Sequence, residues 1–362
     1  MKIAQLTPNS KPIPSPKNRI YAPGLIVGAI SDGMTEKGHE VFLFAGKDSK
    51  TKAKIMYEGN SLFSDYGDLR EPQRTQYELT MASKCFEMAR DNKFDIVHAH
   101  DHTKVIYFAN FVDTPIVFTF HGDPEDDLSE EIDRKRLLKY RDRVKSVAVS
   151  DFQVKNASKY FNFIDRVYHG IDISRLKFNA KPKDHMLFLG RMVDRKGPDI
   201  ALDIAKSLNK KIVLAGEPYS KEDKEFFVKI QTSMKNQETE YLGHIPFDKV
   251  GDIYRQSKVF MMPIRKNEAF GLVMIEAMAC GTPVVVFDRG SAGEIVKDGV
   301  TGFVVKVDDN QAMAKAVQKI YNMPENQYQK MRENCRKHVE EKFSIQKMVD
   351  GYEKVYQKII KQ

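Results

Sequence analysis

The sequence predicts an α/β protein with two doubly wound, Rossmann-like domains, each built on a parallel sheet. Short apolar runs rich in β-branched residues recur along the chain, and segments with helical spacing separate them. These runs form two groups on either side of a polar stretch at residues 167–186. With 362 residues, 41% of them hydrophobic, the chain is longer than most single domains and can bury a sizeable core.

The first half contains five predicted strands. They are the runs KIAQL, EVFLFAG, FDIVHAH, PIVFTFHG and SVAVS. Between the first two, GLIVGAISDGMTEKGHEV predicts a helix that Gly38 closes just before the next strand. The stretch VYHGIDISRLKFNAKPKDHM (Val167–Met186) then carries the polar, Gly and Pro residues of a domain junction. We therefore assign residues 1–172 to an N-terminal domain.

The second half repeats the pattern. Its predicted strands are HMLFLG, KKIVLAG, KVFMMP, PVVVFD and GFVVKV. We assign residues 173–343 to this C-terminal domain. From about residue 326 to 362 the chain has helical spacing and many charges, with no strand after it. This segment is predicted to pack as helices outside a sheet.

Composition narrows the class of protein. Charged residues make up 30%, which does not indicate disorder, and no apolar run approaches the ~20 residues that span a bilayer. Cys85, Cys280 and Cys335 form no CxxC pair or disulfide framework. The opening MKIAQL is too short for the apolar part of a signal peptide. We expect a soluble, cytoplasmic protein.

The net charge of +8 lies mostly in the second half. Residues 171–362 carry 33 basic and 26 acidic side chains, against 25 and 24 in residues 1–170. A basic half can indicate nucleic acid, a membrane surface or a phosphorylated small ligand as partner. Extra solubilising lysines explain most of this excess, so charge alone selects no partner.

The first loop with unusual chemistry lies in LFLGRMVDRKGPDIALDIAKSL. In open α/β sheets ligands bind beyond the carboxyl ends of the strands, and with two such domains the cleft between them is the expected active site. Here Arg191, Arg195 and Lys196 follow a strand and precede Pro198, which suits a first helical position. Cations beside a helix amino terminus suit a phosphate or diphosphate. An ordinary solvated basic loop is an equal alternative.

The second loop is NEAFGLVMIEAMACGTPVVV, which contains Glu268 and Glu276. The helix that carries Glu276 is apolar on nearly every face, so it is predicted to lie inside its domain. A carboxylate there costs several kcal/mol unless it is paired or hydrogen-bonded. The two hydroxyls of a ribose could satisfy Glu276, and the amides around residues 269–271 could meet a phosphate or a sugar hydroxyl. An internal ion pair with Arg or Lys is the alternative.

The third set lies in HAHDH (His98–His102) and TFHGDPEDD (Thr119–Asp127). His98, His100 and His102 alternate, which raises a zinc site as an alternative. No matching Cys or His cluster follows in the sequence, so we favour no metal. His121, at the end of a predicted strand, is the better catalytic candidate.

Taken together, these residues resemble the family 4 glycosyltransferases, retaining enzymes of GT-B architecture. The matching features are the Glu-x7-Glu element EAFGLVMIE, then AMACGTPVV and GEIVKDGVTGFVV, together with GRMVDRKG, VLAGEP, YLGHIP, DIVHAHDH, VFTFHG and HGIDISRL. They occur in the family's order along almost the whole chain. The segment from Glu268 through Val305 is the most specific part of the match.

The resemblance implies a role for each matching residue. Arg191 and Lys196 match the pair that holds the donor's diphosphate, Glu276 the ribose-binding glutamate, and Glu268 the residue that contacts donor-sugar hydroxyls. The other implied contacts are backbone donors at Ala269, Phe270 and Gly271, recognition of the base at Ile245, and a histidine near the transferred sugar at His121. The resemblance thus places His121, Glu268, Arg191 and Lys196 at the catalytic centre.

The resemblance also implies a reaction. A hexose-type sugar moves from a UDP- or GDP-linked donor to an acceptor with retention, and a leaving-phosphate oxygen takes the acceptor's proton. No cofactor, divalent metal or nucleic acid is implied. Residues 1–172 would form the acceptor side, with a final helix at 344–362 crossing back onto it. The acceptor, which could be a saccharide, a lipid-linked molecule or a small molecule, stays open.

The chain departs from the family at its first helix. Many relatives have Gly-Gly where Tyr21 and Ala22 stand, and tyrosine restricts a close backbone approach. Either Lys17, Asn18 and Arg19 compensate, in an acceptor or phosphate loop that includes Tyr21, or donor handling differs, or activity is reduced. His169 also replaces the usual Asn of NGID.

Two alternatives therefore stay beside the transferase. The first is a catalytically weak GT-B protein that binds a nucleotide sugar or a partner, and the second is a nucleotide-sugar epimerase. A dinucleotide oxidoreductase is disfavoured because neither half has GxGxxG after its first strand.

Residues Glu131–Val147 predict a basic amphipathic helix that could touch anionic lipid at the inner membrane surface, although a solvated surface helix is favoured.

Overall fold

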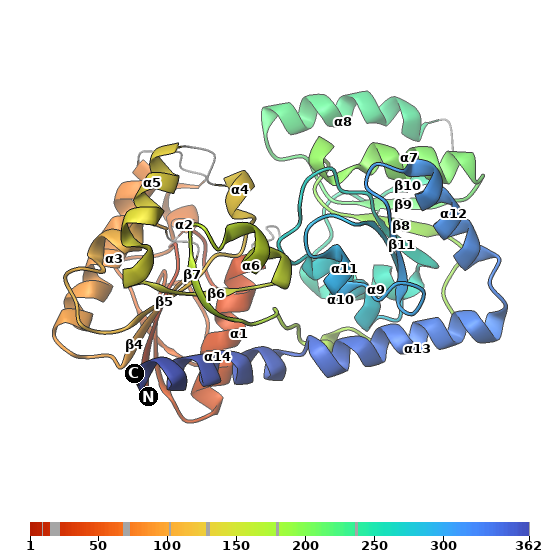
Figure 1. Cartoon of the computed structure of the whole chain (residues 1–362). Helices are drawn as coiled ribbons and strands as arrows, with labels where there is room; N and C mark the ends of the chain where they lie inside the picture. The colour runs from red at the N-terminus through yellow and green to blue at the C-terminus, as the bar shows by residue number, and fades with distance from the viewer. Residues whose placement is uncertain are drawn as a thin grey trace. The chain divides into compact units, whose positions relative to one another are not determined.

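The computed structural model of the protein describes residues 1–8, 10–14, 22–67, 73–100, 103–127, 131–178, 181–235 and 238–361. It divides into two compact units. Unit 1 comprises Met1–Gly170 with Ile345–Gln362, and unit 2 comprises Ile171–Ser344 (Figure 1). Each unit is described by itself below.

Unit 1 is built on a seven-stranded parallel sheet with strand order β3-β2-β1-β4-β5-β6-β7. The strands are β1 (Lys2–Leu6), β2 (Glu40–Phe44), β3 (Lys54–Met56), β4 (Ile96–His100), β5 (Ile116–Thr119), β6 (Lys145–Ala148) and β7 (Asn162–Arg166). The chain winds outward from β1 to β3 and then returns to the other side of β1. The carboxyl ends of β1 and β4 therefore flank the point where the strand order reverses.

The helices of unit 1 come from both ends of the chain. They are α1 (Ala22–Glu36), α2 (Leu62–Tyr66), α3 (Gln73–Arg90), α4 (Pro124–Asp127), α5 (Glu131–Tyr140), α6 (Asp151–Ala157) and α14 (Ile345–Ile360). Helix α14 packs closely along α1, because a Cβ added at Gly33 would lie 2.5 Å from a Val349 methyl carbon. The last helix of the chain is thus part of the N-terminal unit.

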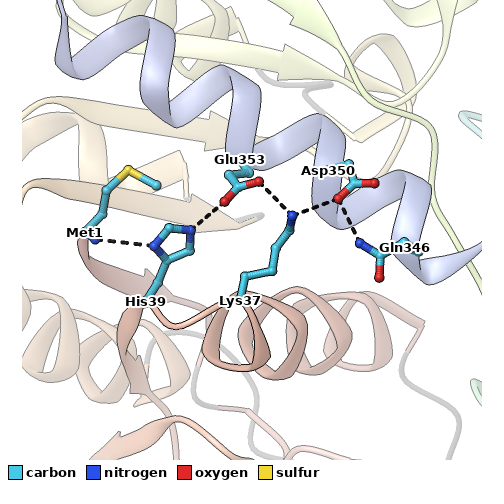
Figure 2. Close-up of polar contacts among 6 residues, drawn as sticks. All are labelled: Met1, Lys37, His39, Gln346, Asp350 and Glu353. Carbon is cyan, nitrogen blue, oxygen red and sulfur yellow. Dashed lines mark hydrogen bonds and ion pairs between the residues drawn. The ribbon is translucent and has the colours of Figure 1, made fainter.

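A polar seam also joins α14 to the end of α1 (Figure 2). Lys37 Nζ lies 3.0 Å from Asp350 Oδ1 and 2.8 Å from Glu353 Oε2. Glu353 also contacts His39 Nε2 at 2.8 Å, and the amino terminus of Met1 lies 3.3 Å from His39 Nδ1. The seam raises the pKa of Lys37 and lowers those of Asp350 and Glu353, mainly through these hydrogen bonds.

Unit 2 has a six-stranded parallel sheet with strand order β10-β9-β8-β11-β12-β13. The strands are β8 (Met186–Leu189), β9 (Ile212–Ala215), β10 (Thr239–Tyr241), β11 (Val259–Met262), β12 (Val284–Phe287) and β13 (Gly302–Val305). The helices are α7 (Pro198–Ser207), α8 (Lys221–Met234), α9 (Phe247–Gln256), α10 (Leu272–Ala279), α11 (Ala292–Ile295), α12 (Asn310–Tyr321) and α13 (Glu325–Lys342). The strand order reverses between β8 and β11.

The predicted fold class, two α/β units on doubly wound parallel sheets, is confirmed. Three strands were absent from the prediction, β3, β7 and β10, and each is an edge strand. Their side chains are mostly exposed or half-buried, so they lack the continuous apolar run that marks a strand buried on both faces.

The predicted helix over Glu131–Val147 is wrong in its extent. Helix α5 ends at Tyr140, a 3-10 turn follows over Arg141–Arg143, and β6 begins at Lys145. Val144 and Val147 are buried. Burial of these β-branched side chains, just before and within β6, outweighs the helical spacing of the charges.

Candidate active site

The first part of the candidate site lies where the strand order of unit 2 reverses. Ligands of open α/β sheets bind at such a point, outside the carboxyl ends of the strands. The loop after β8 (residues 190–197) and the loop after β11 (residues 263–271) flank it. Both loops carry charged residues that the sequence predicts to bind a ligand.

The structure brings Lys196 and Glu268 together although 71 residues separate them. Lys196 Nζ donates to Glu268 Oε2 at 2.5 Å. The side chains are 26% and 22% exposed, so each is largely withdrawn from water while its charged end stays reachable. The pair therefore places a cation and an anion side by side at the reversal point.

Arg265 fixes the β11 loop against the start of α7. Its guanidinium donates to both carboxylate oxygens of Asp199, at 2.9 and 2.5 Å, and to the Asp194 carbonyl oxygen at 2.7 Å. The Arg265 backbone N–H also donates to the Arg195 carbonyl oxygen at 2.9 Å. Sequence reasoning missed Arg265. A cation in a loop has no periodic signal, and only the fold shows that it faces Asp199.

Two glycines let the loops approach. Gly197 has φ +71°, and a Cβ there would lie 2.0 Å from the Pro263 carbonyl oxygen. Gly290 has φ +63°, and a Cβ there would lie 2.2 Å from the Glu268 carbonyl oxygen. Because no side chain fits at either position, glycine is required for the loops after β8, β11 and β12 to meet.

The loop after β12 orients the peptides at residues 268–270. The Ser291 N–H donates to the Glu268 carbonyl oxygen at 2.9 Å, and Ser291 Oγ donates to the Phe270 carbonyl oxygen at 3.0 Å. Gly271 then caps α10 with φ +83°. The first amides of a helix have no acceptor within it, so this turn can receive an anion or a hydroxyl. Ala269 and Phe270 are themselves buried.

Glu276 lies on the one partly exposed face of α10. Positions 272, 273 and 276 are half-buried, whereas five other side chains of the helix are buried. Tyr254 Oη donates to Glu276 Oε2 at 3.3 Å, and Glu276 forms no ion pair within the described part of the chain. Burial raises the pKa of the Glu276 carboxyl to about 7. A carboxylate kept here without a cation is placed to receive polar groups of a ligand.

Two other predicted residues lie in neighbouring loops. Arg191 is exposed directly after β8, next to Gly190, whose N–H donates to the Ala215 carbonyl oxygen at 3.0 Å. Ile245 is half-buried in the connection between β10 and α9. Both positions follow carboxyl ends of strands in the same sheet.

His121, in unit 1, follows β5 and makes two hydrogen bonds to other histidines. His121 Nε2 lies 3.0 Å from His100 Nδ1, and His121 Nδ1 lies 3.1 Å from His169 Nε2. Burial lowers the pKa of His121 to about 3. The ring is therefore neutral at physiological pH and does not supply an acidic proton there.

The nitrogens of His98 and His100 are committed to hydrogen bonds, which does not favour the zinc alternative. His98 contacts Tyr356 and Thr119, while His100 contacts Gln5 and His121. No group of three metal-ligating side chains occurs among the residues that the structure describes. His102 and the loop residues Lys17, Asn18, Arg19 and Tyr21 lie outside the described residues.

The family comparisons match both halves of the chain. The model described as Glycosyltransferase Family 4 matches residues 25–175, and the model described as Glycosyl transferases group 1 matches residues 172–338. Together they cover residues 25–338 and overlap at residues 172–175, just after the boundary between the two units.

Individual proteins are similar over most of the chain. An uncharacterized glycosyltransferase of Methanocaldococcus jannaschii is 30% identical over 73% of this chain and 76% of its own length. The N-acetyl-alpha-D-glucosaminyl L-malate synthase of Bacillus anthracis is 26% identical over 93% of this chain and 94% of its own. The solved structure of Anabaena HepE in complex with UDP and glucose matches 99% of both chains with a TM-score of 0.76 at 17% identity.

Proposed function

This chain belongs to the family 4 glycosyltransferases, and we propose that it transfers a hexose-type sugar from a nucleotide-diphosphate donor to an acceptor with retention. The observation that carries the proposal is the Lys196–Glu268 contact at the reversal point of unit 2. A cation for the diphosphate and a carboxylate for sugar hydroxyls stand side by side there. HepE, which shares the fold, was solved with UDP and glucose.

The donor would lie along the loops of unit 2. The diphosphate would meet Lys196 and Arg191, and the amides before α10 would serve the phosphate and the sugar. The ribose would meet Glu276, whose carboxylate accepts a hydrogen bond from the Tyr254 hydroxyl. The base, uracil or guanine, would lie near Ile245. In the order base, ribose, diphosphate and sugar, the proposed contacts are Ile245, Glu276, the pair Lys196 and Arg191, and the amides before α10.

In the proposed step, the bond between the anomeric carbon and the diphosphate oxygen breaks. The acceptor hydroxyl oxygen forms the new bond on the same face, and its proton passes to an oxygen of the leaving diphosphate. Lys196 and Arg191 would stabilise the charge that develops on that diphosphate. No side-chain nucleophile, cofactor or divalent metal takes part in this proposal.

The acceptor is proposed only by class. The malate synthase of Bacillus anthracis carries a sugar and a small acid in its name, so small hydroxylated acids are the first acceptors to test. A lipid-linked acceptor would bring α5 to a membrane surface. Leu138 on that helix is 51% exposed, but Lys135 pairs with Glu131 at 2.7 Å, as on a solvated surface. No helix in the described ranges is long and apolar enough to cross a membrane.

Nucleotide release from a panel of UDP- and GDP-sugars tests the proposal. We expect the wild-type chain to release nucleotide from one donor, faster with acceptor, and Lys196→Ala to lower kcat by about 100-fold, in the range for a group that stabilises developing charge. Product analysis by NMR should show the donor's anomeric configuration.

An exposed Lys–Glu pair of the same unit provides the matched control. Lys221 lies 3.9 Å from Glu225 on α8, and both side chains are exposed. Lys221→Ala should leave release unchanged. Tight nucleotide binding without release from any donor would support a binding protein instead, and a changed sugar without acceptor would support an epimerase.

A further inference from the structure

A row of buried polar side chains crosses unit 1 beneath His121. Gln5 on β1 contacts His100 on β4, with Oε1 and Nε2 2.8 Å apart. From His100 the row continues to His121 at 3.0 Å and to His169 at 3.1 Å. Gln5 and His100 are fully buried. The row thus reaches from the interior of the sheet to the loop where His121 lies.

The other end of the row lies on α14, the blue helix that carries Asp350 and Glu353 in Figure 2. Gln5 Nε2 donates to Tyr356 Oη at 3.1 Å, and Tyr356 Oη lies 2.5 Å from His98 Nδ1. His98 Nε2 lies 2.9 Å from Thr119 Oγ1, which lies 3.2 Å from Tyr352 Oη. The last helix therefore holds one side of the Gln5 amide.

Counting hydrogens ties the tautomers of His100 and His121 to the orientation of the Gln5 amide. Burial lowers the pKa of His98, His100 and His169 well below the usual value, so these rings are neutral like His121. A neutral imidazole has one donor and one acceptor nitrogen. With the Gln5 carbonyl oxygen facing it, His100 carries its hydrogen on Nε2 and accepts on Nδ1. His121 must then donate from Nε2 and accept on Nδ1, from His169.

The direction of all these bonds depends on the Gln5 amide. Tyr356 has one hydroxyl hydrogen. When that hydrogen goes to His98, the Gln5 NH2 group can donate to Tyr356, and the Gln5 carbonyl turns to His100. Rotating the amide by half a turn would reverse the N–H positions of His100 and His121.

We propose that Gln5 is a positioning residue for sugar transfer, because through His100 it holds His121 in the tautomer with hydrogen on Nε2. The inference rests on the proposed function, in which His121 lies near the transferred sugar. In this tautomer Nδ1 of His121 is an acceptor, which receives the His169 Nε2–H in this structure and would receive a sugar hydroxyl in its place. The opposite tautomer would present an N–H there.

Long-range 1H–15N NMR of the full chain with 15N-labelled histidine tests this directly, with resonances assigned through His100→Gln and His121→Gln. We expect His121 protonated on Nε2 in the wild type and a mixture of tautomers in Gln5→Met, which has no acceptor for His100. Gln5→Glu keeps an acceptor and should restore the wild-type tautomer. An unchanged tautomer in Gln5→Met, or Nδ1–H in the wild type, would overturn the proposal.

Activity provides the second measurement. We expect Gln5→Met to lower kcat about 10-fold with little change in the donor KM, which is the size of effect expected when a hydrogen-bond partner behind a site residue is lost. We expect Gln5→Glu to recover part of the lost kcat. Transfer at the wild-type rate in Gln5→Met would exclude the positioning role. If the wild type transfers no sugar, the proposed function fails, and the NMR result still decides the tautomer.

Two further variants guard against a folding artefact. Lys37→Met removes the two ion pairs of the polar seam in Figure 2 that join Lys37 to α14, without touching the row, and should leave the His121 tautomer and kcat unchanged. If Gln5→Met does not fold, Tyr356→Phe is the alternative, because it removes the hydroxyl that accepts from the Gln5 NH2 group. It should then produce the tautomer mixture, and a single Nε2–H tautomer in that variant would contradict the proposal.

Discussion

Glu276 links burial and stability in one side chain, and in the proposed function it also binds the ribose. The folded-state pKa of about 7 lies above the ordinary glutamate pKa of about 4.5, so the folded protein binds the proton more tightly than the unfolded chain. Stability from this group is therefore full below pH about 4.5 and is lost as the pH rises through about 7. The loss amounts to ~3 kcal/mol, since each pKa unit corresponds to about 1.4 kcal/mol.

We therefore expect Glu276→Gln to raise the free energy of unfolding of the ligand-free protein by a few kcal/mol more at pH 8 than at pH 5. At pH 5 the wild-type carboxyl is already protonated, so the substitution removes no buried charge there. Thermal unfolding at the two pH values measures this difference. The same variant should lose affinity for nucleotide in the proposed function. An equal effect on the melting temperature at both pH values would show that Glu276 titrates normally.

The Lys196–Glu268 contact predicts opposite effects on nucleotide binding. Glu268 competes with a diphosphate for the Lys196 ammonium, so Glu268→Gln should tighten UDP or GDP binding by about 5-fold, or ~1 kcal/mol for a partly exposed pair. Lys196→Met should weaken it. Isothermal titration calorimetry measures both, and a weaker affinity in Glu268→Gln would show that the carboxylate does not oppose the diphosphate.

Among the secondary-structure elements, the junction of β8 and α7 depends on Gly197. Gly197→Ala would combine a left-handed backbone with a Cβ 2.0 Å from a carbonyl oxygen, and should cost more than ~3 kcal/mol. Gly299→Ala is the matched control, because Gly299 has nearly the same φ, +70°, but open space around it. It should cost only ~1 kcal/mol. Urea unfolding compares them, and equal losses would mean that backbone strain alone matters.

The two units do not correspond to two continuous halves of the sequence. The last segment of the chain, which contains α14, belongs to unit 1 although it follows unit 2. Helix α14 supplies six buried apolar or aromatic side chains to unit 1: Met348, Val349, Tyr352, Val355, Tyr356 and Ile359. At roughly 2 kcal/mol each, their burial is worth on the order of 10 kcal/mol, as much as the stability of a typical domain.

A fragment of residues 171–344 should therefore fold and bind nucleotide, whereas residues 1–170 alone should show no cooperative thermal unfolding. Residues 1–344 serve as the control and should retain one transition. Circular dichroism and calorimetry check these outcomes. A stable, cooperative 1–170 fragment would show that α14 is dispensable for the core of unit 1.

The sequence by itself determined the two α/β units, most of their buried strands and the family, because apolar runs and motif order are local properties of the chain. It also pointed to Lys196, Glu268 and Glu276 as charged residues in unusual surroundings. The edge strands β3, β7 and β10 were not predicted, since half-exposed side chains leave no strong hydrophobic pattern in the sequence. The predicted extent of α5 is wrong because burial of Val144 and Val147, just before and within β6, outweighs helical spacing.

Only the tertiary structure decided which distant residues meet. The pairing of Lys196 with Glu268, the Arg265 clamp on Asp199, and the row from Gln5 to His121 all join separate strands or loops. The sheet order brings these groups together, and strand order is not encoded in any one segment. Whether Glu276 sits beside a cation or a hydroxyl was likewise open in the sequence, and the packing of α9 against α10 placed Tyr254 there.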